Sequence, residues 1–145
     1  SNKARKAAEA FHAIHSVDDA ALVRRIDEAA AGRPIELLVQ VHLAREATKH
    51  GVPPGELKPI FEAARACRSA RVVGLMLLPP AVDDAEAARP YFAAVRNLRD
   101  ELAAQGVDRS MLRELSMGMS HDFEVAVEEG ATLVRVGSAI FGHRG

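Results

Sequence analysis

The chain has 145 residues, of which 48% are apolar, and its 19 basic and 20 acidic residues give a formal net charge of −1. This near-neutral balance, with no tryptophan and a single tyrosine, excludes the basic, aromatic-rich surface typical of nucleic-acid binding. The one cysteine, Cys67, excludes a disulfide framework and a multi-thiolate metal site. A lone thiol suits a reducing cytosol, and no apolar run is long enough to cross a bilayer, so we predict a cytoplasmic protein. Because no cysteines or carboxylates cluster at the spacing of metal ligands, we also predict that it binds no metal.

Short apolar runs alternate along the chain with longer segments of helical periodicity. The opening residues 4–10 are predicted to form a helix. Five runs predict β-strands, at residues 11–17, 35–43, 72–78, 112–117 and 132–136. Capping residues and glycines delimit four predicted helices between them, at residues 18–32, 53–69, 83–106 and 121–130. Nearly continuous apolar strands of this kind are typical of a parallel sheet that is covered by helices.

The regular alternation predicts a single α/β domain over residues 1–145, with parallel strands and right-handed crossovers. Two folds fit this pattern, a doubly wound sheet and a partial (β/α)8 TIM barrel. A whole barrel needs roughly 250 residues, so the chain has room for about five βα units.

In both folds the functional groups gather where the strands end. Residues 116–120, Ser-Met-Gly-Met-Ser, are predicted to form a small-residue loop that runs into a helix, and Gly137 and Ser138 form a second such loop. Backbone amides at a helix N-terminus bind anions, and serine hydroxyls add donors. The alternative is that the glycines only turn the chain and the serines only cap the helix.

Arg135 is the most informative single candidate, because it interrupts an apolar strand between Val134 and Val136. A guanidinium in such surroundings needs a partner, which is either a ligand or a nearby carboxylate. His15 and His42, at the ends of neighbouring strands, are weaker candidates, because a lone strand histidine is more often a rim residue. Methionines near the strand ends either line a pocket floor or belong to the ordinary core.

Two long segments near the C-terminus resemble a known family. Residues 114–124, Glu-Leu-Ser-Met-Gly-Met-Ser-His-Asp-Phe-Glu, and residues 129–142, Glu-Gly-Ala-Thr-Leu-Val-Arg-Val-Gly-Ser-Ala-Ile-Phe-Gly, are similar to the C-terminal signature of the pyridoxal 5′-phosphate (PLP) homeostasis proteins. Shorter segments at residues 15–18, 74–76 and 89–92 also fall where this family has them. These proteins are relatives of the alanine racemase barrel, and the resemblance covers essentially the whole chain.

The resemblance implies a PLP barrel of fold type III, of which this chain would supply strands four to eight. It also implies that PLP is the cofactor and that the protein acts in PLP (vitamin B6) and amino-acid homeostasis without an established catalytic turnover. Motif matching assigns the phosphate to Ser116, Ser120, Gly137 and Ser138 and the pyridine nitrogen to Arg135. The same comparison assigns a place in the cofactor pocket to two methionines, Met76 and Met117.

The family holds PLP as a Schiff base on a lysine at the end of the first barrel strand. The four lysines here, Lys3, Lys6, Lys49 and Lys58, do not end a buried strand in the predicted arrangement. We therefore expect that the first three βα units are absent, that this chain forms no covalent bond to PLP, and that its open sheet edges favour pairing with another chain.

Two other functions stay open at this point. A PLP-dependent racemase or decarboxylase on the same barrel would need a second acid/base, typically a tyrosine, and the only tyrosine, Tyr91, falls in a predicted helix. The third possibility is an α/β domain that binds a phosphate group other than that of PLP.

Overall fold

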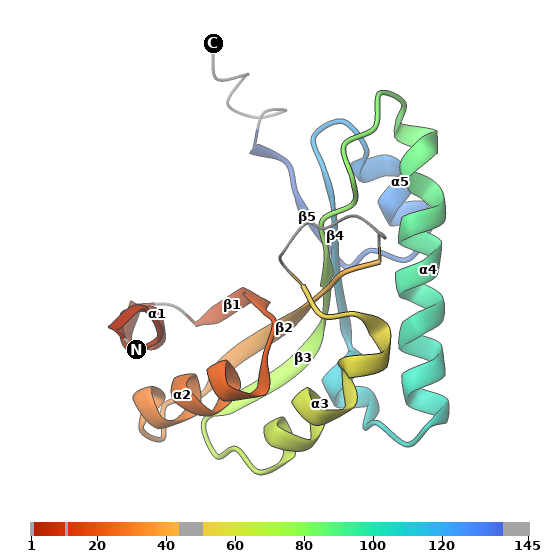
Figure 1. Ribbon diagram of the computed structural model, residues 1–145. Helices are drawn as coiled ribbons and strands as arrows, with labels where there is room; N and C mark the ends of the chain where they lie inside the picture. The colour runs from red at the N-terminus through yellow and green to blue at the C-terminus, as the bar shows by residue number, and fades with distance from the viewer. Residues whose placement is uncertain (1, 11, 44–50, 138–145) are drawn as a thin grey trace.

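The computed structural model describes residues 2–10, 12–43 and 51–137 (Figure 1). Its parallel strands are β1 (Ala13–Val17), β2 (Ile35–Val41), β3 (Ala70–Leu77), β4 (Glu114–Met119) and β5 (Leu133–Arg135). Its α-helices are α1 (Asn2–Ala10), α2 (Ala20–Ala30), α3 (Lys58–Arg65), α4 (Ala85–Ala104) and α5 (Phe123–Glu128). Two 3-10 turns, η1 (Pro54–Glu56) and η2 (Arg109–Leu112), precede α3 and β4.

The order of the strands decides between the two folds that the sequence left open. The five strands follow one another across the sheet in chain order, β1-β2-β3-β4-β5, with no point at which the order reverses. A doubly wound sheet requires such a reversal, whereas a barrel does not. The sheet is also strongly curled, because His15 on β1 lies 3.3 Å from Ser116 on β4, with two strands between them. The prediction of about five βα units of a barrel is confirmed.

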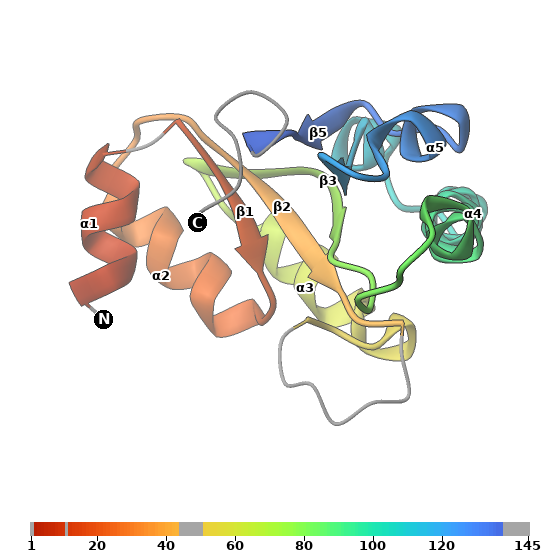
Figure 2. The same ribbon diagram turned by 90° about the horizontal axis from the view of Figure 1, so that it is seen from above.

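The curl gives the sheet two different faces, and Figure 2 shows the helices gathered along the outer one. The larger core lies between these helices and the outward side chains of the strands, such as Leu37, Leu75 and Leu115, all fully buried. A much smaller apolar cluster lies on the concave face and consists of Leu38, Val73 and Met76, with Leu133 packed against it. The two-residue period of a strand separates these clusters, since successive side chains point to opposite faces.

One glycine bulge lets β3 fit between its neighbours. The pairing of β2 with β3 jumps from Leu37↔Val72 to Leu38↔Gly74, so β3 carries one extra residue at this point. A Cβ atom on Gly74 would overlap the carbonyl oxygen of Glu114 at the start of β4. Only glycine therefore allows β4 to approach β3 this closely.

The element boundaries differ from the predicted ones mainly around α3 and η2. The single helix predicted at residues 53–69 is instead the 3-10 turn η1 followed by the shorter helix α3, which ends at Arg65. Leu112, predicted to begin a strand, instead ends η2, because the Asp108 carboxylate accepts the Ser110 N–H at 2.8 Å and starts a turn there. The strand consequently runs over Glu114–Met119, two residues later than expected. The acidic pairs Asp18-Asp19 and Asp83-Asp84 predict N-caps, and the second residue of each pair takes this role: Asp19 accepts the Leu22 N–H and Asp84 accepts the Glu86 N–H. Phe11, predicted to open the first strand, lies outside the described residues.

Within the part of the chain that the structure describes, no helix combines the length and apolar character needed to cross a membrane.

Replacing Gly74 with alanine tests the close approach of β3 and β4. We expect Gly74→Ala to lower the free energy of unfolding by about 2–3 kcal/mol, since the methyl group would collide with backbone that cannot move aside cheaply. Gly55→Ala is the matched control, because no heavy atom lies within 4 Å of its added Cβ, and it should change stability by no more than about 0.5 kcal/mol. Urea unfolding of both variants measures the difference, and equal effects would contradict this account of the bulge.

Candidate functional site

Polar side chains from three strands meet on the concave face of the sheet, and together we call His15, Ser116 and Arg135 the Arg135 cluster. Ser116 is fully buried and lies at the centre. Its Oγ accepts a hydrogen bond from Arg135 Nη1 at 2.8 Å and lies 3.3 Å from His15 Nδ1. Because a serine hydroxyl has one proton of its own, it can donate to His15 Nδ1 while it accepts from Arg135.

Arg135 has three nitrogens, and the protein satisfies only two of them. Nη2 donates to the Leu77 carbonyl oxygen at 2.8 Å, and Nη1 donates to Ser116. Nε is buried and has no hydrogen-bond partner in the described part of the chain. Leaving a buried donor unsatisfied costs about 1–3 kcal/mol, so this nitrogen is a position where an acceptor would be favoured.

The electrostatics of the cluster follow from burial and from one nearby carboxylate. Burial lowers the pKa of Arg135, and the charge of Asp122 opposes this shift. An arginine so shifted still keeps its proton at working pH. Burial also lowers the pKa of His15, and the positive charge of Arg135 lowers it further, which favours a neutral imidazole at pH 7.

The chain leaves β4 through a tight turn that is fixed by Asp122. This buried carboxylate accepts the Met119 N–H at 2.6 Å, and the Asp122 N–H donates to the Met119 carbonyl oxygen at 3.1 Å. Gly118 adopts a φ of +104°, and a Cβ there would lie 2.7 Å from the Ala126 Cβ of α5. Glycine is thus required for α5 to pack against the end of β4. Ser120, half-buried, lies in the turn that follows.

The structure changes the expected extent of the small-residue loop. Four of its five predicted residues belong to β4, so Ser116 points into the concave face from within a strand and does not offer a loop hydroxyl. The following helix begins at Phe123 and has only 6 residues, so it is shorter than predicted. Among the described residues, the turn around Ser120 is the part of this strand end that can offer donors to an anion.

The remaining predicted site residues lie in three different environments. Met76 is buried in the concave cluster beside Leu38. The side chain of Met117, by contrast, packs in the larger core on the outer face, so only its backbone is available to a ligand on the concave face. Gly137 lies just beyond β5, and a Cβ there would meet no atom of the described residues within 4 Å. Ser138 lies outside the described residues.

Sequence reasoning missed the partners that hold Arg135. The Leu77 carbonyl oxygen is a backbone atom and leaves no trace in a sequence pattern. Gln40 was also missed, although it is a buried polar residue on β2 that pairs in register with Met76. The spacing of Leu38 and Gln40, both on the concave face, was the available signal for it.

The lysines and the tyrosine lie away from the Arg135 cluster wherever they are described. Lys3 and Lys6 are exposed on α1, and Lys58 is exposed on α3. Lys49 falls outside the described residues. Tyr91, the only tyrosine in the chain, lies on α4 and packs against the outer core.

Parallel strands in chain order, a strong curl and polar side chains gathered near the carboxyl ends of β4 and β5 define a segment of an α/β barrel. The family model described as "Alanine racemase, N-terminal domain" matches residues 1–145. The chain belongs to this family.

Individual relatives agree with this assignment. The chain is 47% identical to a pyridoxal phosphate homeostasis protein of Aquifex aeolicus over 90% of its own length and 58% of the relative, and 40% identical to one of Pseudomonas aeruginosa over 99% and 61%. It is similar to the structure of PipY from Synechococcus elongatus with PLP bound, with a TM-score of 0.87 and 40% identity over 97% of this chain and 66% of that one. The chain thus spans about three fifths of the curated relatives it matches.

The pKa of His15 can be checked directly. An NMR titration should give a midpoint below the ordinary value of 6.5, since the buried, charged surroundings disfavour the imidazolium. Arg135→Met should raise this midpoint without restoring it fully, because burial persists. Because the folded state releases the His15 proton more readily than the unfolded state, we also expect stability to fall as the pH drops below about 6.5.

An exposed arginine away from the cluster provides the control for that titration. Arg33 lies in the α2–β2 loop, and Arg33→Met should leave the His15 midpoint unchanged. A wild-type midpoint at or above 6.5, or equal shifts in the two variants, would contradict the assigned cause.

Proposed function

We propose that the concave face binds PLP and that the whole protein to which this chain belongs acts in PLP and amino-acid homeostasis. The observation that supports this best is the unpaired, buried Nε of Arg135. The pyridine nitrogen of PLP is a hydrogen-bond acceptor, and a guanidinium can only donate. The pyridine ring would therefore supply both an acceptor for this unpaired donor and a flat apolar surface for the side chains around it.

The type of residue beside the ring also bears on catalysis. PLP, when bound, supplies an electron sink, and that sink is strongest when an acidic residue keeps the pyridine nitrogen protonated. Arg135 donates a hydrogen bond but does not give up its proton at working pH. This chemistry supports binding and storage of the cofactor more than turnover, in keeping with relatives named as homeostasis proteins.

The other contacts follow from the shape of the concave face. Met76, with Leu38 and Leu133, offers an apolar floor for the ring. Ser120 in the turn after β4 and Gly137 after β5 lie at the same ends of neighbouring strands, so with Ser138 they are the proposed phosphate donors. Ser116 acts on the ligand through Arg135, which it holds in place.

A racemase or decarboxylase function has less support. Such an enzyme requires a second acid/base on the ligand side of the sheet, and Tyr91 packs on the opposite side, against the outer core. We therefore propose a cofactor-binding protein with no catalytic residue assigned.

An analogue of PLP in which carbon replaces the ring nitrogen isolates the proposed contact. Wild-type protein should bind PLP about tenfold more tightly than the analogue or better, because a charged donor contributes about 1.5–3 kcal/mol to such a hydrogen bond. Arg135→Met should abolish this preference, since both ligands then lack the donor. Fluorescence or calorimetric titration measures the two affinities.

The control for that experiment is Arg113→Met. This substitution removes the same charge, but Arg113 pairs with Glu36 near the other ends of the strands. It should keep the wild-type preference for PLP. If Arg135→Met kept the preference as well, the pairing of Arg135 with the ring nitrogen would be wrong.

Covalent attachment is a separate prediction. Because none of the described lysines lies on the concave face, borohydride added to the chain with stoichiometric PLP should fix no pyridoxyl group on a lysine. Mass spectrometry of the tryptic peptides checks this. An excess of free lysine, about tenfold, competes for PLP and suppresses non-specific labelling of exposed lysines. A stable adduct at a single lysine would refute the prediction.

A further inference from the structure

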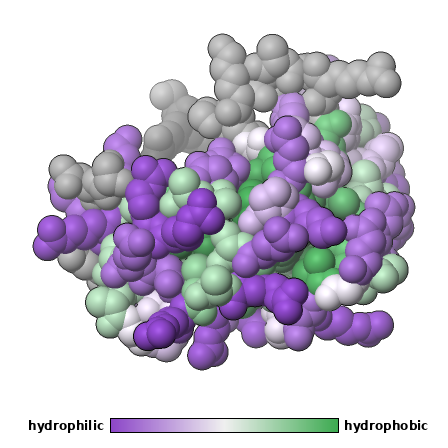
Figure 3. All heavy atoms as spheres, turned by 60° about the horizontal axis from the view of Figure 1, so that its bottom comes forward, coloured by the Kyte–Doolittle hydropathy of each residue, from purple (hydrophilic) through white to green (hydrophobic). Residues whose placement is uncertain are grey.

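A pocket with a concentration of arginines lies at the amino-terminal ends of the strands, opposite the Arg135 cluster. Arg65 from the end of α3, Arg71 from the start of β3 and Arg113 from the residue after η2 all line it. Three separate segments therefore contribute arginine residues to the lining of one hollow, and we call it the amino-end pocket. Figure 3 shows this side of the molecule, where apolar surface is visible between hydrophilic side chains.

The charge of this pocket is not balanced from within. Among the described residues that line it, Glu36 is the single carboxylate, and Glu36 Oε2 accepts from Arg113 Nη2 at 2.9 Å. Arg71 pairs in register with Glu36 across β2 and β3 but makes no ion pair or hydrogen bond with the rest of the described chain. Hydrogen bonds to the Asp108 carboxylate lower its pKa most, and the charge of Arg65 lowers this pKa further through space. Within the described residues, Arg65 and Arg71 are thus left without a direct counter-ion.

The rest of the lining indicates what kind of anion would fit. Ala64, Val72 and Met111 form an apolar wall beside the arginines. Paired guanidinium groups match the oxygens of a dianionic phosphate through their planar donor geometry. An apolar wall next to them matches a phosphate that carries an organic group better than it matches the free ion.

We propose that the amino-end pocket binds small phosphate monoesters, with Arg71 and Arg65 on the phosphate group and the apolar wall against the organic part. Arg113 is held at the rim by Glu36 and completes the positive field. This site is separate from the Arg135 cluster, so it does not depend on the proposed function of the concave face.

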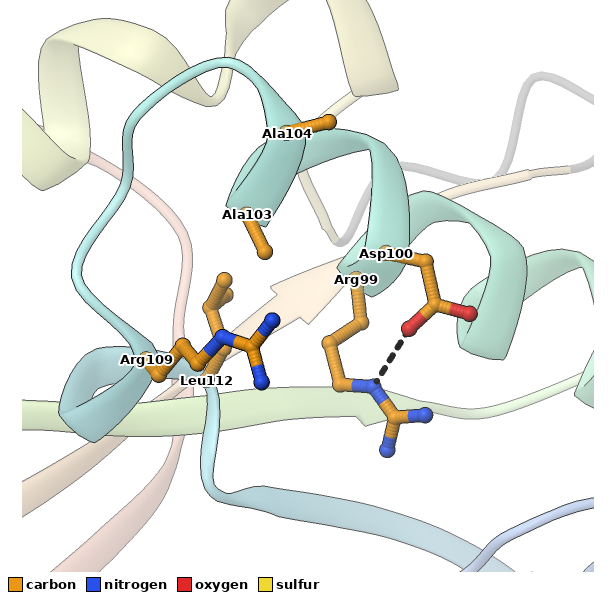
Figure 4. Close-up of a pocket in the computed structure, with 6 residues that line it drawn as sticks. All are labelled: Arg99, Asp100, Ala103, Ala104, Arg109 and Leu112. Carbon is orange, nitrogen blue, oxygen red and sulfur yellow. Dashed lines mark hydrogen bonds and ion pairs between the residues drawn. The ribbon is translucent and has the colours of Figure 1, made fainter.

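A neighbouring pocket on the other side of η2 provides a built-in comparison. Figure 4 shows Arg109 from η2 and Arg99 from α4 projecting into it, with Arg99 Nε paired to Asp100 Oδ1 at 3.2 Å. Among the described residues that line it, Arg109 is the arginine without a counter-ion, so a phosphate would find one free guanidinium there and not two. Arg109→Gln therefore removes the same charge from the same end of the molecule without touching the amino-end pocket.

The test is a calorimetric titration of the chain with phenyl phosphate and, separately, with inorganic phosphate at low salt. We expect Arg71→Gln to weaken phenyl phosphate binding about tenfold, the loss typical of a charge-assisted hydrogen bond, and Arg109→Gln to weaken it less than twofold. Arg71→Lys, which keeps the charge but not the fork, should fall between them. Circular dichroism confirms that each variant is folded, as expected for exposed side chains.

Several outcomes would overturn the proposal. Equal losses in Arg71→Gln and Arg109→Gln would show a general electrostatic effect of this end of the molecule. Equal affinity for inorganic phosphate and phenyl phosphate would show that the apolar wall takes no part. Loss of phenyl phosphate binding in Arg135→Met, with no loss in Arg71→Gln, would place the ligand on the concave face. Retained phenyl phosphate binding in Arg135→Met, by contrast, supports the amino-end pocket whether or not PLP binds the concave face.

Discussion

The buried guanidinium of Arg135 is the interaction around which the concave face is organised. A charged group taken out of water must be satisfied nearly in full, and three strands contribute to doing so. β3 supplies the Leu77 carbonyl oxygen, β4 supplies the Ser116 hydroxyl, and β5 carries the arginine itself. These contacts require the strands to curve toward one another, which the same curl achieves when it brings His15 within reach of Ser116.

The residues of the concave face contribute to ligand binding in different ways. The apolar cluster around Met76 suits a flat ring, while the unpaired Nε of Arg135 would fix the orientation of that ring by a hydrogen bond. Ser116 contributes indirectly, because its hydroxyl is used by Arg135 and His15. Membership of the alanine racemase N-terminal-domain family agrees with this architecture. Neutral His15 and cationic Arg135 coexist here because burial and mutual repulsion both disfavour a second positive charge.

Much of the fold could be predicted from the sequence because its signals are local. Asp19 and Asp84 cap their helices as expected, since a capping residue acts within one turn. The bulge at Gly74 could not be predicted, because glycine is required there by the close approach of the Glu114 backbone, 40 residues later in the chain. Arg135 was identified by its misfit in an apolar strand, but its partners depend on strand pairing. Met117 shows the converse limit, since a motif match does not reveal that its side chain points to the outer face.

The strand order has a further consequence for how the chain reaches this structure. In the described sheet each strand pairs with its neighbours in chain order, and each of these parallel pairings spans the connection that lies between the two strands. A parallel pair of strands can form only once its crossover connection has been closed, so loop-closure entropy opposes every step of this sheet. Here the sheet can grow one βα unit at a time. The Arg135 cluster is the exception, because it joins His15 to Ser116 across 101 residues. Its polar contacts therefore require the curl of the whole sheet, so the shape of the ligand face depends on more of the chain than any single pair of strands does.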